Sequence, residues 1–480
     1  MIEMDTRLLA DNILKELGHE PTAGQQELIG LLSTFVTEPA KPRSQPAFLL
    51  RGYAGTGKTS LVSALVRVLP LAGLQSVLMA PTGRAAKVLA SYSKKQALTI
   101  HRKIYKTIAD SDGGTKMVLS ANPHKYTLFI VDEASMIPGA GGSGDNGTFS
   151  GRDLLDDLIA YVYGSEGCRL LLIGDSAQLP PVGDNESPAL DQEILTKKYH
   201  LDTTTYELHE VVRQSLESGI LTNATALRRK LGAGVALPFF NLNGFNDIRM
   251  IDGTTFEDAL NSCYSRFGIE NTAIITRSNK RANLFNNEVR ARLLFRETEL
   301  SSGDIIMITR NNYFWLPEGA KAGFIANGDM AEVRRISHIG EMYGFRFAEA
   351  SIKLIDYPEE EVIEVKLLLD SMNSTTANLP QDEMQKLFDE IMLDYVQVGS
   401  EKSRIEKVRN NPYFNALQVK FAYALTCHKT QGGQWDAVFI EHGYLTSDMV
   451  DEGFIRWLYT ALTRSTTEVY LVNFNHDFFE

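Results

Sequence analysis

A short glycine-rich segment constrains the fold of this 480-residue chain more than any other feature. It reads Gly52-Tyr-Ala-Gly-Thr-Gly-Lys58-Thr59, follows the apolar run Phe48-Leu49-Leu50, and matches the pattern G-x-x-x-x-G-K-[ST]. Apolar residues then recur at helical spacing, at Leu61, Leu65, Val68 and Leu69. The segment therefore predicts a strand, a tight loop and a helix in direct succession.

This succession is the context of a loop that binds a nucleoside triphosphate. Its glycines allow successive backbone N–H groups to curl round a polyphosphate at a helix N-terminus. The lysine would reach the terminal phosphates, and the threonine hydroxyl would bind Mg²⁺. The residues predicted to bind ATP here are Gly52, Ala54, Gly55, Thr56, Gly57, Lys58 and Thr59. An ordinary glycine-rich turn is the alternative, and the helical spacing after the loop argues against it.

Length and composition indicate a multidomain protein. A chain of this size, with 44% hydrophobic residues, is longer than a single hydrophobic core can accommodate, so roughly two to four domains are expected. The net charge of −12 argues mildly against a protein that coats nucleic acid by overall electrostatic attraction, so any contact with DNA must be local. Since no long apolar run and no secretory signal occur, we expect a cytoplasmic protein with no membrane partner. The three cysteines, interpreted as packing residues rather than disulfide or zinc ligands, are Cys168, Cys263 and Cys427.

Two stretches alternate short apolar strands with amphipathic helices, which is typical of doubly wound parallel sheets. The first has expected strands at 47–51, 76–80, 128–132 and 169–174. The second has expected strands at 272–276, 437–441 and 468–472, and helices at 279–295 and 449–462. The fold class is therefore α/β, with two similar lobes.

Two insertions interrupt these lobes. Residues 105–126 centre on Asp112-Gly113-Gly114, which has hairpin turn chemistry, with a plain surface excursion as the alternative. Residues 335–415 are β-rich at 345–354 and 360–369 and carry a polar helix at 381–395, as in a small β domain. The glycine-rich run 139–147 is expected to be a flexible loop. The expected division places the first lobe at 1–104 and 127–240, and the second at 241–334 and 416–480.

Polar side chains follow two of the first lobe's strands. Asp132 would hold Mg²⁺ through its water shell, and Glu133 would orient and deprotonate an attacking water. The amide of Gln178, at the carboxyl end of another parallel strand, would sense a γ-phosphate. Turn formation is the simpler interpretation of the Gly-Asp and Pro-Pro pairs around it, and both interpretations can hold together. An acidic pair after a buried strand is weak evidence for an ATPase on its own, but the phosphate loop earlier in the chain makes that evidence strong.

Further motifs follow in a fixed order. They are Ala80-Pro-Thr82-Gly-Arg84-Ala-Ala-Lys87, Thr99-Ile-His101, Asp132-Glu133-Ala-Ser, Gly174-Asp175-Ser-Ala-Gln178-Leu-Pro-Pro, Val212-Arg213-Gln214, Thr426-Cys-His428-Lys429-Thr-Gln431-Gly432 and Tyr459-Thr-Ala-Leu-Thr463-Arg464. The series spans residues 22 to 472 and resembles the superfamily 1 helicases, in particular the RecD, Pif and Dda group called superfamily 1B. The resemblance implies two RecA-like domains, a hairpin wedge in the first and an SH3-like β insertion in the second.

The resemblance also implies roles in binding and hydrolysing the nucleotide. Gln25 matches the family's adenine-reading glutamine, with Gln26 as the alternative, and Gly432 joins the nucleotide-binding residues. Arg213 and Arg464 match arginines that stabilise charge on the γ-phosphate, and surface ion pairs are the alternative for both. The implied catalytic set is Lys58, Glu133, Gln178, Arg213 and Arg464.

Single-stranded DNA is the implied partner, contacted mainly at its phosphates. The residues matching strand-contacting motifs are Thr82, Arg84, Thr99, His101, Thr426, His428 and Lys429. A structural role is the alternative for each, and a Gln-Gly turn favours the last two. Aromatic candidates for base stacking, each more often a core residue, are Tyr105, Tyr126, Phe239, Phe240, Phe314 and Trp315.

These observations predict an ATP-dependent DNA helicase that uses Mg²⁺ and acts on single-stranded and forked duplex DNA. By resemblance its direction is 5′ to 3′, and a monomer would suffice because both arginines are supplied in cis. The alternatives are a translocase, stimulated by single-stranded DNA, that displaces bound proteins, and a nucleotide-gated binding module.

Overall fold

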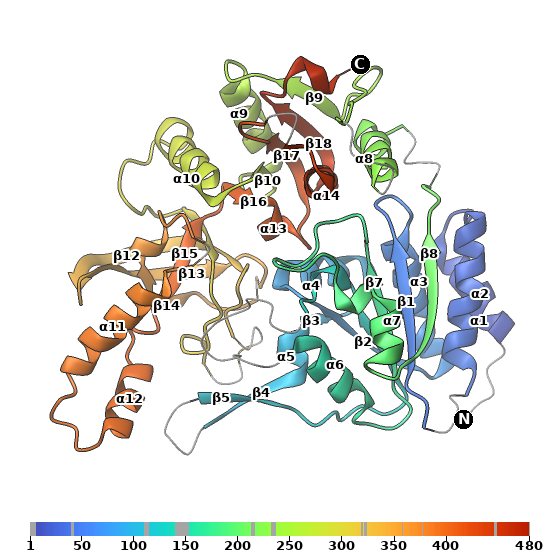
Figure 1. Cartoon of the computed structure of the whole chain (residues 1–480), viewed down its shortest axis with the longest axis horizontal. Coiled ribbons are helices and arrows are strands. Elements are labelled where there is room, and N and C mark those ends of the chain that lie inside the picture. Colours follow the sequence, from blue (N-terminus) through green and yellow to red (C-terminus); the bar gives the residue numbers. More distant parts are fainter. Residues whose placement is uncertain are drawn as a thin grey trace.

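The computed structural model of the chain describes residues 6–39, 43–109, 115–139, 153–212, 217–231, 237–317, 320, 324–357, 359–376, 378–445 and 449–479. It has two lobes, each built on a parallel sheet, and a small β-barrel beside the second lobe (Figure 1). Among the helices in these ranges, none combines the length and the apolar character needed to cross a bilayer.

The first lobe is a six-stranded sheet in the order β3-β2-β6-β7-β1-β8, with every neighbouring pair parallel. Its strands are β1 (Pro46–Gly52), β2 (Gln75–Ala80), β3 (Ala97–Thr99), β6 (Thr127–Val131), β7 (Arg169–Gly174) and β8 (Asp202–Leu208). Its helices are α1 (Thr6–Leu17), α2 (Ala23–Thr37), α3 (Lys58–Val68), α4 (Gly83–Ser93), α5 (Ile100–Ile104), α6 (Leu154–Tyr163) and α7 (Gln192–Lys197).

Both faces of this sheet are buried because side chains alternate along each strand. Phe48 and Leu50 of β1 join one apolar core with α1, α2 and α3, whereas Leu49 joins a second core with α6. The doubly wound architecture and its four predicted strands are therefore confirmed. Strands β3 and β8 were not anticipated, since the first is three residues long and the second is a partly exposed edge strand.

The second lobe is a five-stranded parallel sheet in the order β16-β10-β17-β18-β9. Its strands are β9 (Ile248–Ile251), β10 (Thr272–Thr276), β16 (Ala424–Thr426), β17 (Trp435–Glu441) and β18 (Ser465–Val472). Its helices are α8 (Gly219–Lys230), α9 (Phe256–Phe267), α10 (Asn279–Glu288), which continues as a π-helix (Val289–Leu293), α13 (Cys427–Thr430) and α14 (Glu452–Leu462).

Helix α8 differs from the division expected from the sequence, which placed it in the first lobe. Its buried residues Ile220, Ala224 and Leu227 lie at helical spacing and join the apolar core of the second lobe. The helix packs on α14 (Figure 1). The boundary was misplaced because nothing local marks which sheet an amphipathic helix will cover. The three cysteines are buried, as expected of packing residues.

The inserted β domain is a closed barrel of β11 (Ile305–Ile308), β12 (Met330–Met342), β13 (Phe345–Leu354), β14 (Ile363–Leu368) and β15 (Leu417–Phe421). Two helices, α11 (Gln381–Leu393) and α12 (Glu401–Arg409), lie between β14 and β15. The predicted small β insertion is confirmed, but the bounds 335–415 were too narrow. Closure requires β11 to pair with both β12 and β15, and two of these three strands lie outside those bounds.

The hairpin insertion of the first lobe is also confirmed. Strands β4 (Tyr105–Ala109) and β5 (Thr115–Leu119) pair antiparallel, with Tyr105 opposite Leu119. The hairpin extends from the lower edge of the first lobe in Figure 1. The predicted turn at 112–114 and all but the first residue of the predicted loop at 139–147 lie outside the described residues.

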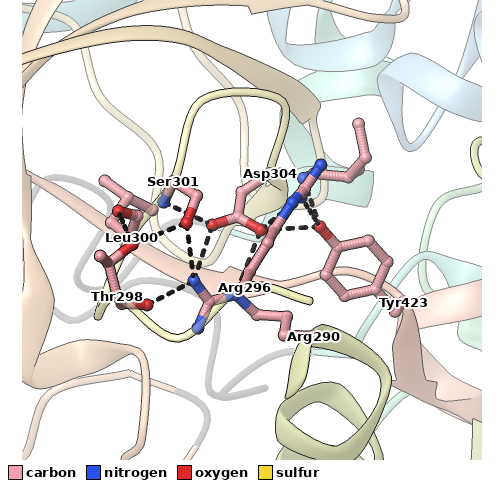
Figure 2. Close-up of polar contacts among 8 residues, drawn as sticks. Arg290, Arg296, Thr298, Leu300, Ser301, Asp304 and Tyr423 are labelled. Atoms are coloured by element: carbon pink, nitrogen blue, oxygen red, sulfur yellow. Dashed lines mark hydrogen bonds and ion pairs between the residues drawn. The ribbon is translucent and has the colours of Figure 1, made fainter. Parts of the chain in front are cut away.

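A buried ionic cluster joins the barrel to the second lobe (Figure 2). Asp304, completely buried just before β11, accepts from Arg290 Nε at Oδ1 and Nη2 at Oδ2, both at 3.1 Å. Arg296 Nη1 and the Tyr423 hydroxyl also donate to Oδ1, at 2.6 and 2.8 Å, and the Ser301 N–H donates to Oδ2 at 2.7 Å. Arg290 belongs to the π-helix that continues α10, and the other groups lie in the connections before β11 and after β15, so the cluster fixes the barrel on the second lobe.

Replacing Asp304 with asparagine should test this cluster. Because the change leaves two largely buried guanidinium groups without their counter-charge, we expect the free energy of unfolding to fall by about 3–5 kcal/mol. The denaturant midpoint measures this. Glu193→Gln is the matched control, since it breaks the exposed Lys197–Glu193 pair and should hardly move the midpoint. Equal midpoints for the two variants would contradict the assignment.

Candidate active site

The phosphate loop folds between β1 and α3 as predicted. Gly55 and Gly57 have φ angles of 76° and 79°, in the left-handed region that favours glycine. A Cβ at Gly57 would lie 2.4 Å from Nε2 of Gln25. Lys58 Nζ donates to the carbonyl oxygens of Gly52 at 2.6 Å and Tyr53 at 2.8 Å, so the ammonium lies across the loop.

Gln25 lies behind this loop and is completely buried. Its Nε2 donates to the carbonyl oxygen of Thr56 at 3.0 Å, and its Oε1 accepts from the Thr22 N–H at 3.1 Å in the capping box that begins α2. Gln26 is exposed. The amide of Gln25 thus supports the loop from within the protein, and its contact with adenine stays a prediction.

The acidic pair follows β6 at the carboxyl edge of the sheet. Glu133 has a φ of 54°, a left-handed conformation that costs a non-glycine residue of order 1 kcal/mol. Asp132 Oδ1 accepts from the Glu133 N–H at 2.9 Å. Burial of Asp132, together with the Glu133 carboxylate, raises the pKa of Asp132 to about 6. A cation would relieve that unfavourable charge, and the Thr59 hydroxyl in the same cavity is another oxygen ligand of the kind Mg²⁺ prefers.

These groups line a cavity of about 460 Å³ between the two lobes. The predicted site residues that line it are Ala54, Gly55, Gly57, Lys58, Thr59, Asp132, Glu133 and Gln178 from the first lobe, and Gly432 and Arg464 from the second. Gly52 and Thr56 of the loop, and Gln25 behind it, are buried and do not line the cavity. Arg213 lies outside the described residues. The fold therefore brings most of the predicted catalytic set together at one interface.

Arg464 follows α14 and is only 4% exposed. Its guanidinium donates to the carbonyl oxygens of Thr460 at 3.1 Å and Gly433 at 3.4 Å, and to Oγ1 of Thr463 at 3.3 Å. All of these partners belong to the second lobe. The arginine is therefore held by its own lobe while it lines the cavity, rather than taking part in a surface ion pair.

Gln178 offers unused hydrogen-bonding capacity to the cavity. Its side chain is 7% exposed, and its Oε1 is buried without a hydrogen-bond partner among the described residues. A buried acceptor of this kind is unusual in a folded protein and is typical of positions that meet a ligand or a bound water.

Two of the predicted strand-contacting residues already have structural roles as helix caps. Thr82 Oγ1 caps α4 by accepting from the Ala85 N–H at 3.2 Å, and Thr99 Oγ1 caps α5 in the same way at 3.2 Å. Thr426 precedes α13 and makes no capping bond with its side chain. Burial lowers the pKa of His101 to about 4, so its ring is neutral near pH 7.

Arg84 contacts the second lobe. Its guanidinium stacks 3.9 Å from the ring centroid of Trp435 and donates to the carbonyl oxygen of Gln434 at 3.1 Å. His428 is exposed, while Lys429 donates to Oδ1 of Asn327 at 2.7 Å. Arg84 thus connects α4 to the second lobe, and its predicted contact with DNA would require that connection to open.

The aromatic candidates divide between core and surface. Tyr105 and Phe240 are buried, and the Trp315 indole N–H donates to the carbonyl oxygen of Asn415 at 2.7 Å. The exposed candidates are Tyr126, Phe239 and Phe314. These three are the exposed members of the six, and Trp315 is half-buried.

Sequence reasoning missed the residues of α14 that cross to the first lobe. The Tyr459 hydroxyl accepts from the Ala54 N–H of the phosphate loop, and Arg456 donates to the carbonyl oxygen of Ser176. Thr460 Oγ1 accepts from the Leu179 N–H at 2.9 Å. Tyr459 stands in the motif that ends at Arg464, but no local pattern distinguishes a tyrosine that packs within its lobe from one that reaches across.

Comparisons with known proteins agree with the order of these motifs. The family described as AAA domain matches residues 40–244, and the UvrD-like helicase C-terminal domain matches residues 421–472. The chain is 34% identical over 184 residues to the ATP-dependent RecD2 DNA helicase of Deinococcus radiodurans, covering 37% of this chain and 21% of that protein. The resemblance of the chain to the superfamily 1B helicases is confirmed.

Other similarities are more extensive but weaker in identity. The ATP-dependent DNA helicase Dda of Enterobacteria phage T4 is 25% identical over 279 residues, covering 54% of this chain and 55% of Dda. The chain thus spans about a fifth of RecD2 and about half of Dda. The crystal structure of Pif1 helicase from Bacteroides in complex with ADP-AlF3 and ssDNA has 17% sequence identity and a TM-score of 0.46, covering 95% of this chain and 93% of Pif1.

The barrel meets α4 at another buried carboxyl group. Asp329 is 1% exposed; its Oδ2 accepts from the Ala326 N–H at 2.7 Å, and its Oδ1 has no hydrogen-bond partner among the described residues. A Cβ at Gly83, where α4 begins, would lie 2.6 Å from that Oδ1. Burial, reinforced by the Asp356 carboxylate, raises the pKa of Asp329 to about 8.

This raised pKa predicts a pH-dependent loss of stability. Between pH 4 and pH 8 the folded state keeps a proton on Asp329 that the unfolded state has lost, so stability falls as pH rises and levels off above about 8. Asp329→Asn mimics the protonated form. We expect the melting temperature of the variant minus that of the parent to increase from pH 4.5 to pH 8.5. Asp389→Asn on exposed α11 should show no such trend, and a pH-independent difference for Asp329→Asn would contradict the reasoning.

Proposed function

We propose that this chain is an ATP-dependent DNA helicase that hydrolyses ATP between its lobes and moves along single-stranded DNA. The observation that carries the proposal is the shared cavity, lined by Lys58 and Glu133 from one lobe and Arg464 from the other. Phosphoryl transfer relies on positioning and charge stabilisation rather than covalent chemistry, and this arrangement suits it. The names of RecD2 and Dda support the same activity.

The roles of individual residues follow from their positions. Lys58 would exchange the loop carbonyls for the terminal phosphates, and Glu133 would orient and deprotonate the attacking water. Gln178 would accept from that water through its unpaired Oε1, or donate to the γ-phosphate through its amide NH₂ group. Thr59 and Asp132 would hold Mg²⁺, which when bound neutralises charge on the phosphates.

ATP would favour closure of the lobes because its phosphates meet residues from both, and hydrolysis would release them. A DNA strand held across the lobes would then be gripped alternately, which is translocation. The predicted strand contacts lie on α4, α5 and α13, and the first two of these helices belong to the opposite lobe from the third. We further propose that the β4–β5 hairpin is the wedge that splits forked duplex DNA, that movement is 5′ to 3′, and that a monomer is active.

Substitution of the proposed general base is the first test. Glu133→Gln should lower the rate of ATP hydrolysis stimulated by single-stranded DNA by about 100-fold or more while nucleotide binding persists. Steady-state hydrolysis and binding of a fluorescent ATP analogue measure the two effects. Glu166→Gln, at the exposed partner of Tyr126, is the control and should hydrolyse ATP at the parental rate. Unchanged hydrolysis in Glu133→Gln would place the base elsewhere.

Duplexes with a single overhang test direction and strand separation together. We expect ATP-driven opening of a duplex with a 5′ overhang and little opening with a 3′ overhang. A variant with a shortened β4–β5 hairpin should keep hydrolysis stimulated by single-stranded DNA but lose strand separation. Equal or absent opening of both duplexes by the parent protein would remove the helicase assignment, and full unwinding by the shortened variant would remove the wedge.

A further inference from the structure

We infer that Tyr459 is a positioning residue that ties the phosphate loop to the Gln178 loop and sets the place of Arg464. The inference rests on the proposed ATP hydrolysis, because it concerns the same cavity. It assigns a role to the hydroxyl group of one side chain on α14, the helix by which the second lobe contacts the first.

The Tyr459 hydroxyl bridges two separate loops of the first lobe. It accepts from the Ala54 N–H of the phosphate loop at 2.8 Å and donates to Oδ2 of Asp175 at 2.6 Å. The other oxygen of Asp175 accepts from the Ala177 N–H at 2.9 Å, which shapes the turn leading to Gln178. One side chain from the second lobe therefore connects two elements that would both meet the γ-phosphate.

The surroundings hold this hydroxyl in its neutral form. Tyr459 is 1% exposed, and Asp175 is 2% exposed. Burial, reinforced by the Asp175 carboxylate, raises the pKa of Tyr459 well above its usual value. A neutral phenol can donate and accept at once, as this bridge requires, whereas a phenolate can only accept.

The same stretch of helix carries Arg464. Thr460, next to Tyr459, accepts from the Leu179 N–H, and its own carbonyl oxygen accepts from Arg464 Nε at 3.1 Å. Residues 459–460 of α14, which bond to the first-lobe turn 175–179, thus also hold the arginine that lines the cavity. Since packed helices shift as rigid units, a displacement of either loop would be transmitted to the arginine.

The ring and the hydroxyl have separable roles. The ring belongs to the apolar core of the second lobe, which phenylalanine would fill equally well. Removing the oxygen alone would leave the Ala54 N–H and one Asp175 oxygen unpaired in a buried position. The two loops would then no longer be held in a fixed position relative to α14, whereas the contacts that bind the phosphates would remain.

Tyr459→Phe tests the inference through a split between kcat and KM. We expect kcat for ATP hydrolysis stimulated by single-stranded DNA to fall about tenfold, since small misplacements of catalytic groups have effects of this size or larger, while KM for ATP changes less than about twofold. Tyr163→Phe is the matched control, because it also removes one tyrosine hydroxyl bond, to the Pro46 carbonyl oxygen at 2.8 Å within the first lobe. Its kcat should equal that of the parent.

Each outcome is decisive. A parental kcat in Tyr459→Phe, a loss confined to KM, or an equal fall in Tyr163→Phe would overturn the positioning role while leaving the proposed function intact. Absence of ATP hydrolysis in the parent protein would remove the proposed function and this inference with it.

A second measurement uses Asp175→Ala, alone and combined with Tyr459→Phe. If both residues act through one bridge, the kcat of the combined variant should be close to that of the less active single variant. Independent, multiplicative losses would show that Tyr459 does not act through Asp175. Melting temperatures of all variants separate this effect from a general loss of folding.

Discussion

The contact of α14 with the carboxyl edge of the first sheet is the interaction on which the site depends. The order β6-β7-β1 places the acidic pair, the Gln178 turn and the phosphate loop side by side, because parallel strands all end at the same edge. Among the described residues that line the cavity, the arginine is Arg464, and it comes from the second lobe. The helix that precedes Arg464 contacts the loops of this edge through Tyr459, Thr460 and Arg456.

The barrel is attached very differently to the two lobes. The Asp304 cluster joins it to the second lobe through charged, fully paired groups, whereas Asp329 faces α4 with an unpaired oxygen. Breaking the first contact would leave buried charges uncompensated, which is costly. Helix α4 also reaches the barrel through Lys87, whose Nζ lies 3.7 Å from Asp356 Oδ1 and donates to the Ile355 carbonyl oxygen at 3.3 Å.

Local pattern was sufficient for much of the architecture. The bounds of β7, β10 and β13 agree with the predicted ranges, since each is a short run of apolar or alternating residues between turn signals. The predictions that failed depended on partners distant in sequence: α8 joined the other lobe, and the barrel recruited β11 and β15 from outside the expected insertion. Pairing and packing of this kind have no signature in the segment itself.

The sequence by itself determined the chemistry: which residues can cradle phosphates, hold a cation, activate water and offset charge, and in what order they occur. Tertiary structure decided which of these side chains are free to act. The amide of Gln25 is bonded to Thr22 and Thr56, Arg84 is stacked on Trp435, and the Tyr459 hydroxyl reaches Ala54 from the other lobe. The reason is physical, because each hydrogen bond depends on an approach of a few ångströms that only the complete fold creates, between residues that can be hundreds of positions apart.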